Sequence, residues 1–173
     1  MSSLTRYALW LAPEEAASGP LQLVINELAS RYSGPIFSPH MTLLGWAKGE
    51  EEALIAKTES LASTLAPIDV NLTGFAGAPY YFRCFFAPLD SSGELRHAVN
   101  EASSIFDASA GTNYQPHISL LYGQLDREEK KSIPGQIGDK VPRTFSLDSV
   151  QLVRMSVSVS GWVAVAESPL TGS

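Results

Sequence analysis

One short phrase occurs twice in this chain, and it constrains the fold more than any other feature of the sequence. Residues 39–46 read PHMTLLGW, and residues 116–123 read PHISLLYG. Each copy consists of Pro, His, an apolar residue, a hydroxyl residue and two leucines, and together the copies hold two of the three histidines. A phrase written twice in this way predicts that two parts of the chain share one local structure.

Both phrases are expected to form β-strands. Because successive side chains of a strand point to opposite faces, His40 and Thr42 share one face, and so do His117 and Ser119. The apolar residues between them point the other way, toward a core. Each predicted strand therefore presents an imidazole beside a hydroxyl from a rigid element.

A second marker repeats at nearly the same distance. The aromatic segments 7–13 and 81–89 are both expected to be strands, and both contain an Ala-Pro pair. These pairs lie 75 residues apart (87 minus 12), and the paired histidines lie 77 apart (117 minus 40). Nearly equal offsets predict a duplicated strand–helix–strand unit, with repeats at about 5–77 and about 80–166 of one domain, 1–173.

Hydrophobic periodicity predicts the remaining elements. Helices are expected at about 19–32, 48–66 and 91–108, further strands at 68–77, 144–155 and 158–168, and a Gly- and Pro-rich loop at 133–144.

Composition excludes several classes of function. The net charge of -6 disfavours binding of long nucleic acid, which usually needs a basic stripe, but it allows a small anionic ligand at a local site. No apolar run reaches the ~20 residues of a membrane helix, and no signal peptide precedes the first strand. Cys84 is the single cysteine and cannot form an internal disulfide. A single cysteine fits a reducing compartment, so we expect a cytoplasmic protein. We also expect it to be a monomer.

No metal or cofactor is expected. No spacing of His, Cys and Asp resembles a zinc site, and no Gly-rich loop resembles a P-loop. The acidic run at 49–52 is explained by the start of a helix, where negative charge is favourable.

The doubled phrase suggests a chemistry. If the halves pack about a pseudo-two-fold axis, two imidazoles and two hydroxyls face each other across a cleft. One imidazole can take a proton and the other can give one, while the hydroxyls donate hydrogen bonds to an anion. These groups suit in-line attack of water on a phosphodiester, which needs proton transfer at both the attacking and the leaving oxygen. A single His-x-Thr in a strand is usually structural, but two copies in matched halves favour catalysis.

The two H-x-[TS] motifs resemble those of the 2H phosphoesterase superfamily. The chain is further similar to its plant and fungal cyclic phosphodiesterases in the start YALWLAP, in GPIFSPHMTL, YYFRCFF and PHISLLYG with the following REEKK, and in WVAVAES. The resemblance implies an α+β, bilobal, duplicated fold with two antiparallel sheets facing a central cleft and helices outside. It implies metal-independent hydrolysis of ADP-ribose 1″,2″-cyclic phosphate and nucleoside 2′,3′-cyclic phosphates to 2′-phosphates, and a connection to tRNA splicing.

Site residues follow from the same resemblance. His40 and His117 match the catalytic histidines. Pseudo-symmetry makes their roles hard to tell apart, and we take His117 as the base and His40 as the acid. The expected substrate-binding residues are Thr42, Ser119, Tyr122, Trp10 and Phe82. Tyr122 would lie near the phosphate, and Trp10 and Phe82 would lie at opposite rims of the cleft with a purine between them.

Two other functions are compatible with the sequence: processing of RNA ends that carry a cyclic phosphate, and non-catalytic binding of nucleotides. Other residues are expected to do less. His97 should be exposed on its helix, and Trp46 and Trp162 should only pack. Arg83 and Arg154 either hold a phosphate or are solvated, and strand alternation turns Arg83 away from Phe82.

Overall fold

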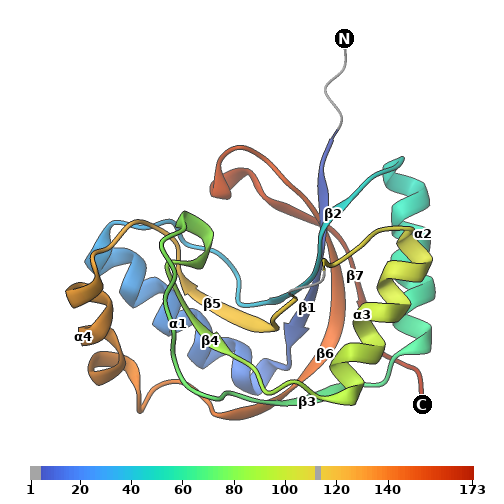
Figure 1. Cartoon of the computed structure of the whole chain (residues 1–173). Coiled ribbons are helices and arrows are strands. Elements are labelled where there is room, and N and C mark those ends of the chain that lie inside the picture. Colours follow the sequence, from blue (N-terminus) through green and yellow to red (C-terminus); the bar gives the residue numbers. More distant parts are fainter. Residues whose placement is uncertain (1–4, 112–113) are drawn as a thin grey trace.

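The computed structural model describes residues 5–111 and 114–173, and within them it shows an α+β fold (Figure 1). In chain order the elements are β1 (Tyr7–Pro13), α1 (Glu15–Tyr32), β2 (Met41–Ala47), α2 (Glu51–Thr64), β3 (Ile68–Asn71), η1 (Tyr81–Arg83), β4 (Phe85–Pro88), α3 (Gly93–Phe106), β5 (His117–Leu121), α4 (Arg127–Ile137), β6 (Thr144–Arg154), η2 (Val159–Gly161) and β7 (Val163–Pro169).

The described strands form one curled antiparallel sheet instead of the two separate sheets expected. The strand order is β3-β6-β1-β2-β5-β4, and β7 pairs with β6. Strands β2 and β5, which carry the two copies of the phrase, are joined only at Met41 and Ile118. The sheet is therefore continuous but nearly divided between the two motifs, which explains how it can curl around a hollow.

The halves of the sheet do not correspond to the halves of the sequence. Strands β6 and β7 come from the second predicted repeat, yet β6 pairs with β1 and β3 of the first. Strand β2 of the first repeat in turn pairs with β5 of the second. Because strands cross between the halves, the hydrogen bonding ties the whole chain into one unit.

The helices cover the outer side of the curled sheet. In Figure 1, α1 and α4 lie on the side of β4 and β5, while α2 and α3 lie on the side of β6 and β7. Their inward stripes are apolar; for example, Leu54 and Leu61 of α2 and Leu95 of α3 are buried in the main core. No helix of the described residues is long and apolar enough to cross a membrane.

The predicted start of one helix and one predicted loop were wrong. Helix α1 begins at Glu15 and not near residue 19, because the backbone N–H groups of Ala17 and Ser18 already donate to the carbonyl of Glu14. Pro20 consequently lies inside the helix, where it removes one hydrogen bond on the exposed side.

The expected loop at 133–144 is also helical as far as Ile137. Asp126 caps α4 by accepting a hydrogen bond from the backbone of Glu129 at 2.8 Å, and Ile133 and Ile137 are fully buried one turn apart. Burial of this pair outweighs the weak helix propensity of Pro134 and Gly135.

Two predicted strands begin with a turn. Residues 81–83 form the 3-10 turn η1 before β4, and residues 159–161 form η2 before β7. The difference matters for function, because a 3-10 turn does not alternate its side chains between two faces. Both turns border the hollow of the sheet.

Candidate active site

All seven site residues predicted from the sequence line one cavity of about 820 Å³ on the concave side of the sheet. Strand β2 and its lead-in supply His40 and Thr42, β5 supplies His117 and Ser119, and Tyr122 follows β5 directly. Trp10 comes from β1 and Phe82 from η1. The cavity therefore lies over the place where β2 and β5 are joined at Met41 and Ile118.

The two histidines are held in the same way. Nδ1 of His40 lies 2.7 Å from the carbonyl oxygen of Ser38, and Nδ1 of His117 lies 2.9 Å from that of Gln115. A carbonyl oxygen only accepts, so each Nδ1 carries the proton and donates it. In both copies a proline, with its fixed φ, stands between the carbonyl and the histidine. The remaining ring nitrogen, Nε2, is left to accept or give a proton.

His40 lies deep in the cavity. It is only 5% exposed, its ring stacks on Trp10 with centroids 3.5 Å apart and planes 7° apart, and Phe37 packs against it edge-on. Burial lowers the pKa of His40 to about 4, although the hydrogen bond to Ser38 acts in the opposite direction. His40 is therefore neutral at physiological pH.

His117 has a different surrounding. It is partly buried, Phe86 packs edge-on at 5.0 Å, and Nη2 of Arg83 lies 3.4 Å from its Nδ1. Burial lowers the pKa of His117, the hydrogen bond to Gln115 opposes this, and the charge of Arg83 lowers it further.

Tyrosines support the two hydroxyl residues. Tyr122 is buried and stacks on Phe37 at 3.9 Å, and burial raises the pKa of its hydroxyl, so it stays a hydrogen-bond donor. Tyr114 was not predicted from the sequence. Its hydroxyl donates to the backbone carbonyl of Thr42 at 2.7 Å and so links the segment before β5 to β2. Sequence periodicity gives no signal for this contact because Tyr114 lies outside any strand.

The aromatic side chains differ from the expected arrangement. Trp10 is 5% exposed and one face of its ring is covered by His40, so it is not an exposed rim residue. Phe82 is 48% exposed, and its ring stacks on Trp162 at 5.8 Å. Trp162, expected only to pack, also lines the cavity and meets Trp10 edge-on. The accessible aromatic surface is thus formed by Phe82 and Trp162.

The sequence left the roles of Arg83 and Arg154 open, and the structure gives the two side chains different partners. Arg154 binds Glu51 through two nitrogens, at 3.0 and 2.7 Å, and Tyr7 donates to the same carboxylate. Both arginines line the cavity, but Arg83 lies beside His117, because η1 replaces strand alternation and brings Phe82 and Arg83 to one side. The expectation that Arg83 turns away from Phe82 was wrong.

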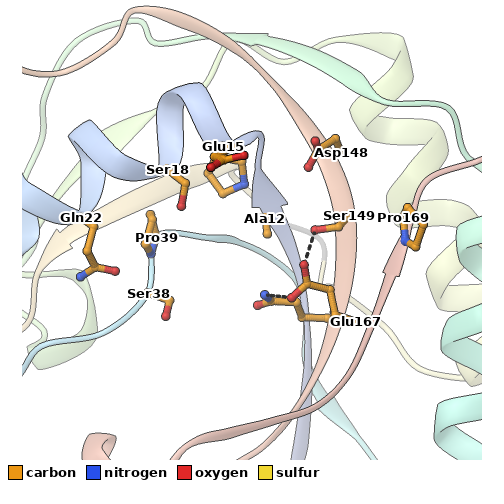
Figure 2. A pocket seen from close by; sticks show the side chains of 12 residues that line it. Ala12, Glu15, Ser18, Gln22, Ser38, Pro39, Asp148, Ser149, Glu167 and Pro169 are labelled. Atoms are coloured by element: carbon orange, nitrogen blue, oxygen red, sulfur yellow. Dashed lines mark hydrogen bonds between the residues drawn. The ribbon is translucent and has the colours of Figure 1, made fainter.

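A second hollow of about 720 Å³ lies on the same concave face, near the start of α1 and beside β6 and β7 (Figure 2). Its lining contains Glu15, Asp148 and Glu167 and no lysine or arginine, and Ser149 and Gln151 donate to Glu167. The cavity with the histidines has the opposite character, because the described residues of its lining include arginines and no carboxylate.

The remaining titratable candidates lie elsewhere. His97 is exposed on α3, as expected. Across residues 5–111 and 114–173, no group of three His, Cys, Asp or Glu side chains is placed to hold a metal ion.

Two histidines, each followed by a hydroxyl residue and both facing one cavity of a curled antiparallel sheet, define the architecture of the 2H phosphoesterases. The chain belongs to the 2′-5′ RNA ligase superfamily, whose family model matches residues 13–158 and so includes both motifs.

The chain is also similar to one relative in sequence and to two solved structures in fold. The chain is 29% identical to the cyclic phosphodiesterase of Arabidopsis thaliana over 126 residues, which are 73% of this chain and 70% of that protein. Its fold is similar to TT0787 of Thermus thermophilus, with a TM-score of 0.62, 20% identity, and coverage of 96% and 98%. It is also similar to LigT of E. coli complexed with 3′-AMP, with a TM-score of 0.62, 14% identity, and coverage of 98% and 99%.

Proposed function

We propose that this chain is a cyclic phosphodiesterase that opens nucleoside 2′,3′-cyclic phosphates and ADP-ribose 1″,2″-cyclic phosphate. The observation that carries the proposal is the pair of histidines, each fixed through Nδ1 with Nε2 free, in one cavity with Thr42 and Ser119. The Arabidopsis relative is itself named a cyclic phosphodiesterase, which supports the same class of hydrolase.

The two histidines divide the proton transfers. At the working pH the base must be neutral and the acid must be protonated. This combination of protonation states is most populated when the base has the lower pKa. His40, with a pKa of about 4, suits the base, and His117, which is less deeply buried, suits the acid. This reverses the assignment drawn from the sequence, where pseudo-symmetry left no means to distinguish the two.

The reaction then proceeds in one displacement. Nε2 of His40 accepts a proton from water as the water oxygen bonds to phosphorus. The bond from phosphorus to the 3′ oxygen breaks, and that oxygen takes a proton from Nε2 of His117. The product is the 2′-phosphate. Two imidazoles supply both proton transfers, so no step calls for a metal ion.

Neutral donors hold the phosphate. Thr42 and Ser119 donate to the non-bridging oxygens as negative charge grows, and the hydroxyl of Tyr122 lies beside Ser119. Phe82, which is 48% exposed, and the partly buried Trp162 next to it offer ring surface on which a base can stack, worth ~1–3 kcal/mol. Every group comes from one chain, so we propose that the monomer is active.

Small nucleotides fit the charge pattern better than long RNA. The carboxylates of the second hollow stand next to the cavity on the same face and would repel a further phosphate. LigT of E. coli has been crystallised with 3′-AMP, ATP and NADP+, which are small nucleotides, although its likeness to this chain concerns the fold. RNA end processing is therefore the second candidate, and a link to tRNA splicing stays a prediction.

Turnover assays separate these functions. We expect hydrolysis of 2′,3′-cyclic AMP in EDTA at the rate seen without it, and slower hydrolysis of an oligonucleotide with a 2′,3′-cyclic end. Faster turnover of the oligonucleotide would favour RNA end processing. Binding of the cyclic nucleotide without any turnover would indicate a non-catalytic module, and activity restored only by a divalent ion would contradict the mechanism.

A further inference from the structure

Arg83 has a position that the two-histidine mechanism does not use. We propose that Arg83 is a catalytic residue whose guanidinium binds a non-bridging oxygen of the substrate phosphate beside His117. The inference rests on the proposed phosphodiesterase function, since it assigns a further residue to that reaction.

The contact between Arg83 and His117 is not a hydrogen bond of the free protein. Nη2 of Arg83 lies 3.4 Å from Nδ1 of His117, but Nδ1 already donates its proton to Gln115 at 2.9 Å. Two donors therefore face each other, and the guanidinium keeps its N–H groups for another acceptor. Phe86 lies under the guanidinium at 5.4 Å and holds it over the ring.

The charge of Arg83 is not balanced by a neighbouring acid. In the part of the chain that the structure describes, Arg83 makes no salt bridge, whereas Arg154 is bound by Glu51 at 2.7 Å. Among the described residues that line the cavity with Arg83, none is an aspartate or glutamate. The partly buried guanidinium of Arg83 therefore takes its acceptor from a bound ligand. A phosphate diester is an anion of the required size.

Such a contact also links binding to protonation. Arg83 disfavours the charged form of His117 while the cavity holds no anion. A phosphate on Arg83 offsets that charge, so the pKa of His117 rises when substrate is bound and the ring becomes the acid that the leaving oxygen needs. The other charged or titratable groups lining this cavity are Arg6, His40, Tyr122 and Arg154. None of these four is a carboxylate that could offset the charge of Arg83.

Sulfate is a suitable probe because its charge is constant over the range in which histidine titrates. We would titrate the His117 ring by NMR with and without sulfate in the wild type, in Arg83→Gln and in Arg143→Gln. Arg143 is the matched control, because it also lies over a phenylalanine, Phe75 at 5.7 Å, but not at the cavity. We expect sulfate to raise the pKa of His117 in the wild type and the control.

In Arg83→Gln the pKa of His117 should start higher, and sulfate should bind about 10- to 100-fold more weakly, the usual value of one hydrogen bond to a charged group. kcat/KM should fall by about the same factor, with the alkaline limb of its pH profile at higher pH. Arg83→Lys keeps the charge and should keep the His117 pKa low while binding sulfate less well, and it replaces the glutamine variant if that does not fold.

Unchanged sulfate affinity and an unchanged pKa of His117 in Arg83→Gln would overturn the proposal. The readout does not depend on turnover. If the wild type hydrolyses no cyclic phosphate, the proposed function fails, while the sulfate titration still decides whether Arg83 binds an anion next to His117.

Discussion

The two copies of the phrase share their backbone anchoring but differ in their surroundings. Each histidine donates from Nδ1 to the carbonyl two residues before it, across a proline. His40 is then enclosed by Trp10 and Phe37, whereas His117 lies beside a cation and is only partly buried. The repeated sequence thus fixes a common ring orientation, and the non-repeated neighbours separate the two pKa values. Equivalent positions in a duplicated unit can in this way take opposite roles.

The largest expected effect is the loss of either histidine. His40→Ala and His117→Ala should each lower kcat by ~10²–10⁴-fold, because a general acid or base typically contributes that much. His97→Ala is the control, since His97 is exposed on α3 and does not line the cavity. Circular dichroism should show that all three variants stay folded. A loss in His97→Ala as large as in the other two would contradict the paired-motif model.

A change of leaving group should distinguish the acid from the base. On a 4-nitrophenyl phosphodiester of a nucleoside the departing phenolate needs no proton, so His117→Ala should lose roughly 100-fold less activity than on the cyclic nucleotide. His40→Ala should be impaired to a similar degree on both, because water must still be deprotonated. If His40→Ala is the variant rescued by the good leaving group, the roles are those first drawn from the sequence.

The same difference should appear in stability. His40 has a folded-state pKa of about 4 against 6.5 unfolded, so the unfolded state binds more protons between these values. The stability that comes from neutral, buried His40 is fully present above pH 6.5 and is lost as the pH falls toward 4. By pH 5 the free energy of unfolding should have fallen by about 2 kcal/mol. The slope of unfolding free energy between pH 7 and 5 should flatten more in His40→Gln than in His117→Gln. Equal slopes in the two variants would mean that the two rings are equally enclosed.

Much of the site follows from the sequence because it lies on strands. The period of two residues places His40 with Thr42 and His117 with Ser119, and the structure brings all four into one cavity. The alternation rule fails where a strand is preceded by a 3-10 turn, so the place of Arg83 was left open and that of Trp162 at the cavity was missed. Both are set by backbone turns that hydrophobic patterns do not encode.

Long-range pairing accounts for the other differences. The crossing of β6 between β1 and β3 and the single join of β2 to β5 depend on contacts between distant segments. A local repeat cannot show whether its copies form two sheets or one. The burial of His40 by Trp10 is equally non-local, which explains why the pKa order of the histidines was not available from the sequence.

The smallest expected effect tests how the two motifs are held together. Tyr114, three residues before His117, donates from its hydroxyl to the backbone carbonyl of Thr42 at 2.7 Å, where β2 and β5 are otherwise joined only at Met41 and Ile118. Tyr114→Phe removes that one hydrogen bond, and kcat should fall about 2- to 10-fold, as expected for a net ~0.5–1.5 kcal/mol.

If Tyr114 acts through the position of Thr42, its loss should cost little once Thr42 has become alanine, so the two effects will not add. Tyr7→Phe is the matched control, because it removes a hydrogen bond of the same length, to Glu51, outside the cavity. A merely structural role for Tyr114 would lower Tm in both backgrounds and reduce kcat independently of Thr42. Additive losses in the double variant would therefore mean that the two motifs are positioned separately, and that the tyrosine does not couple them.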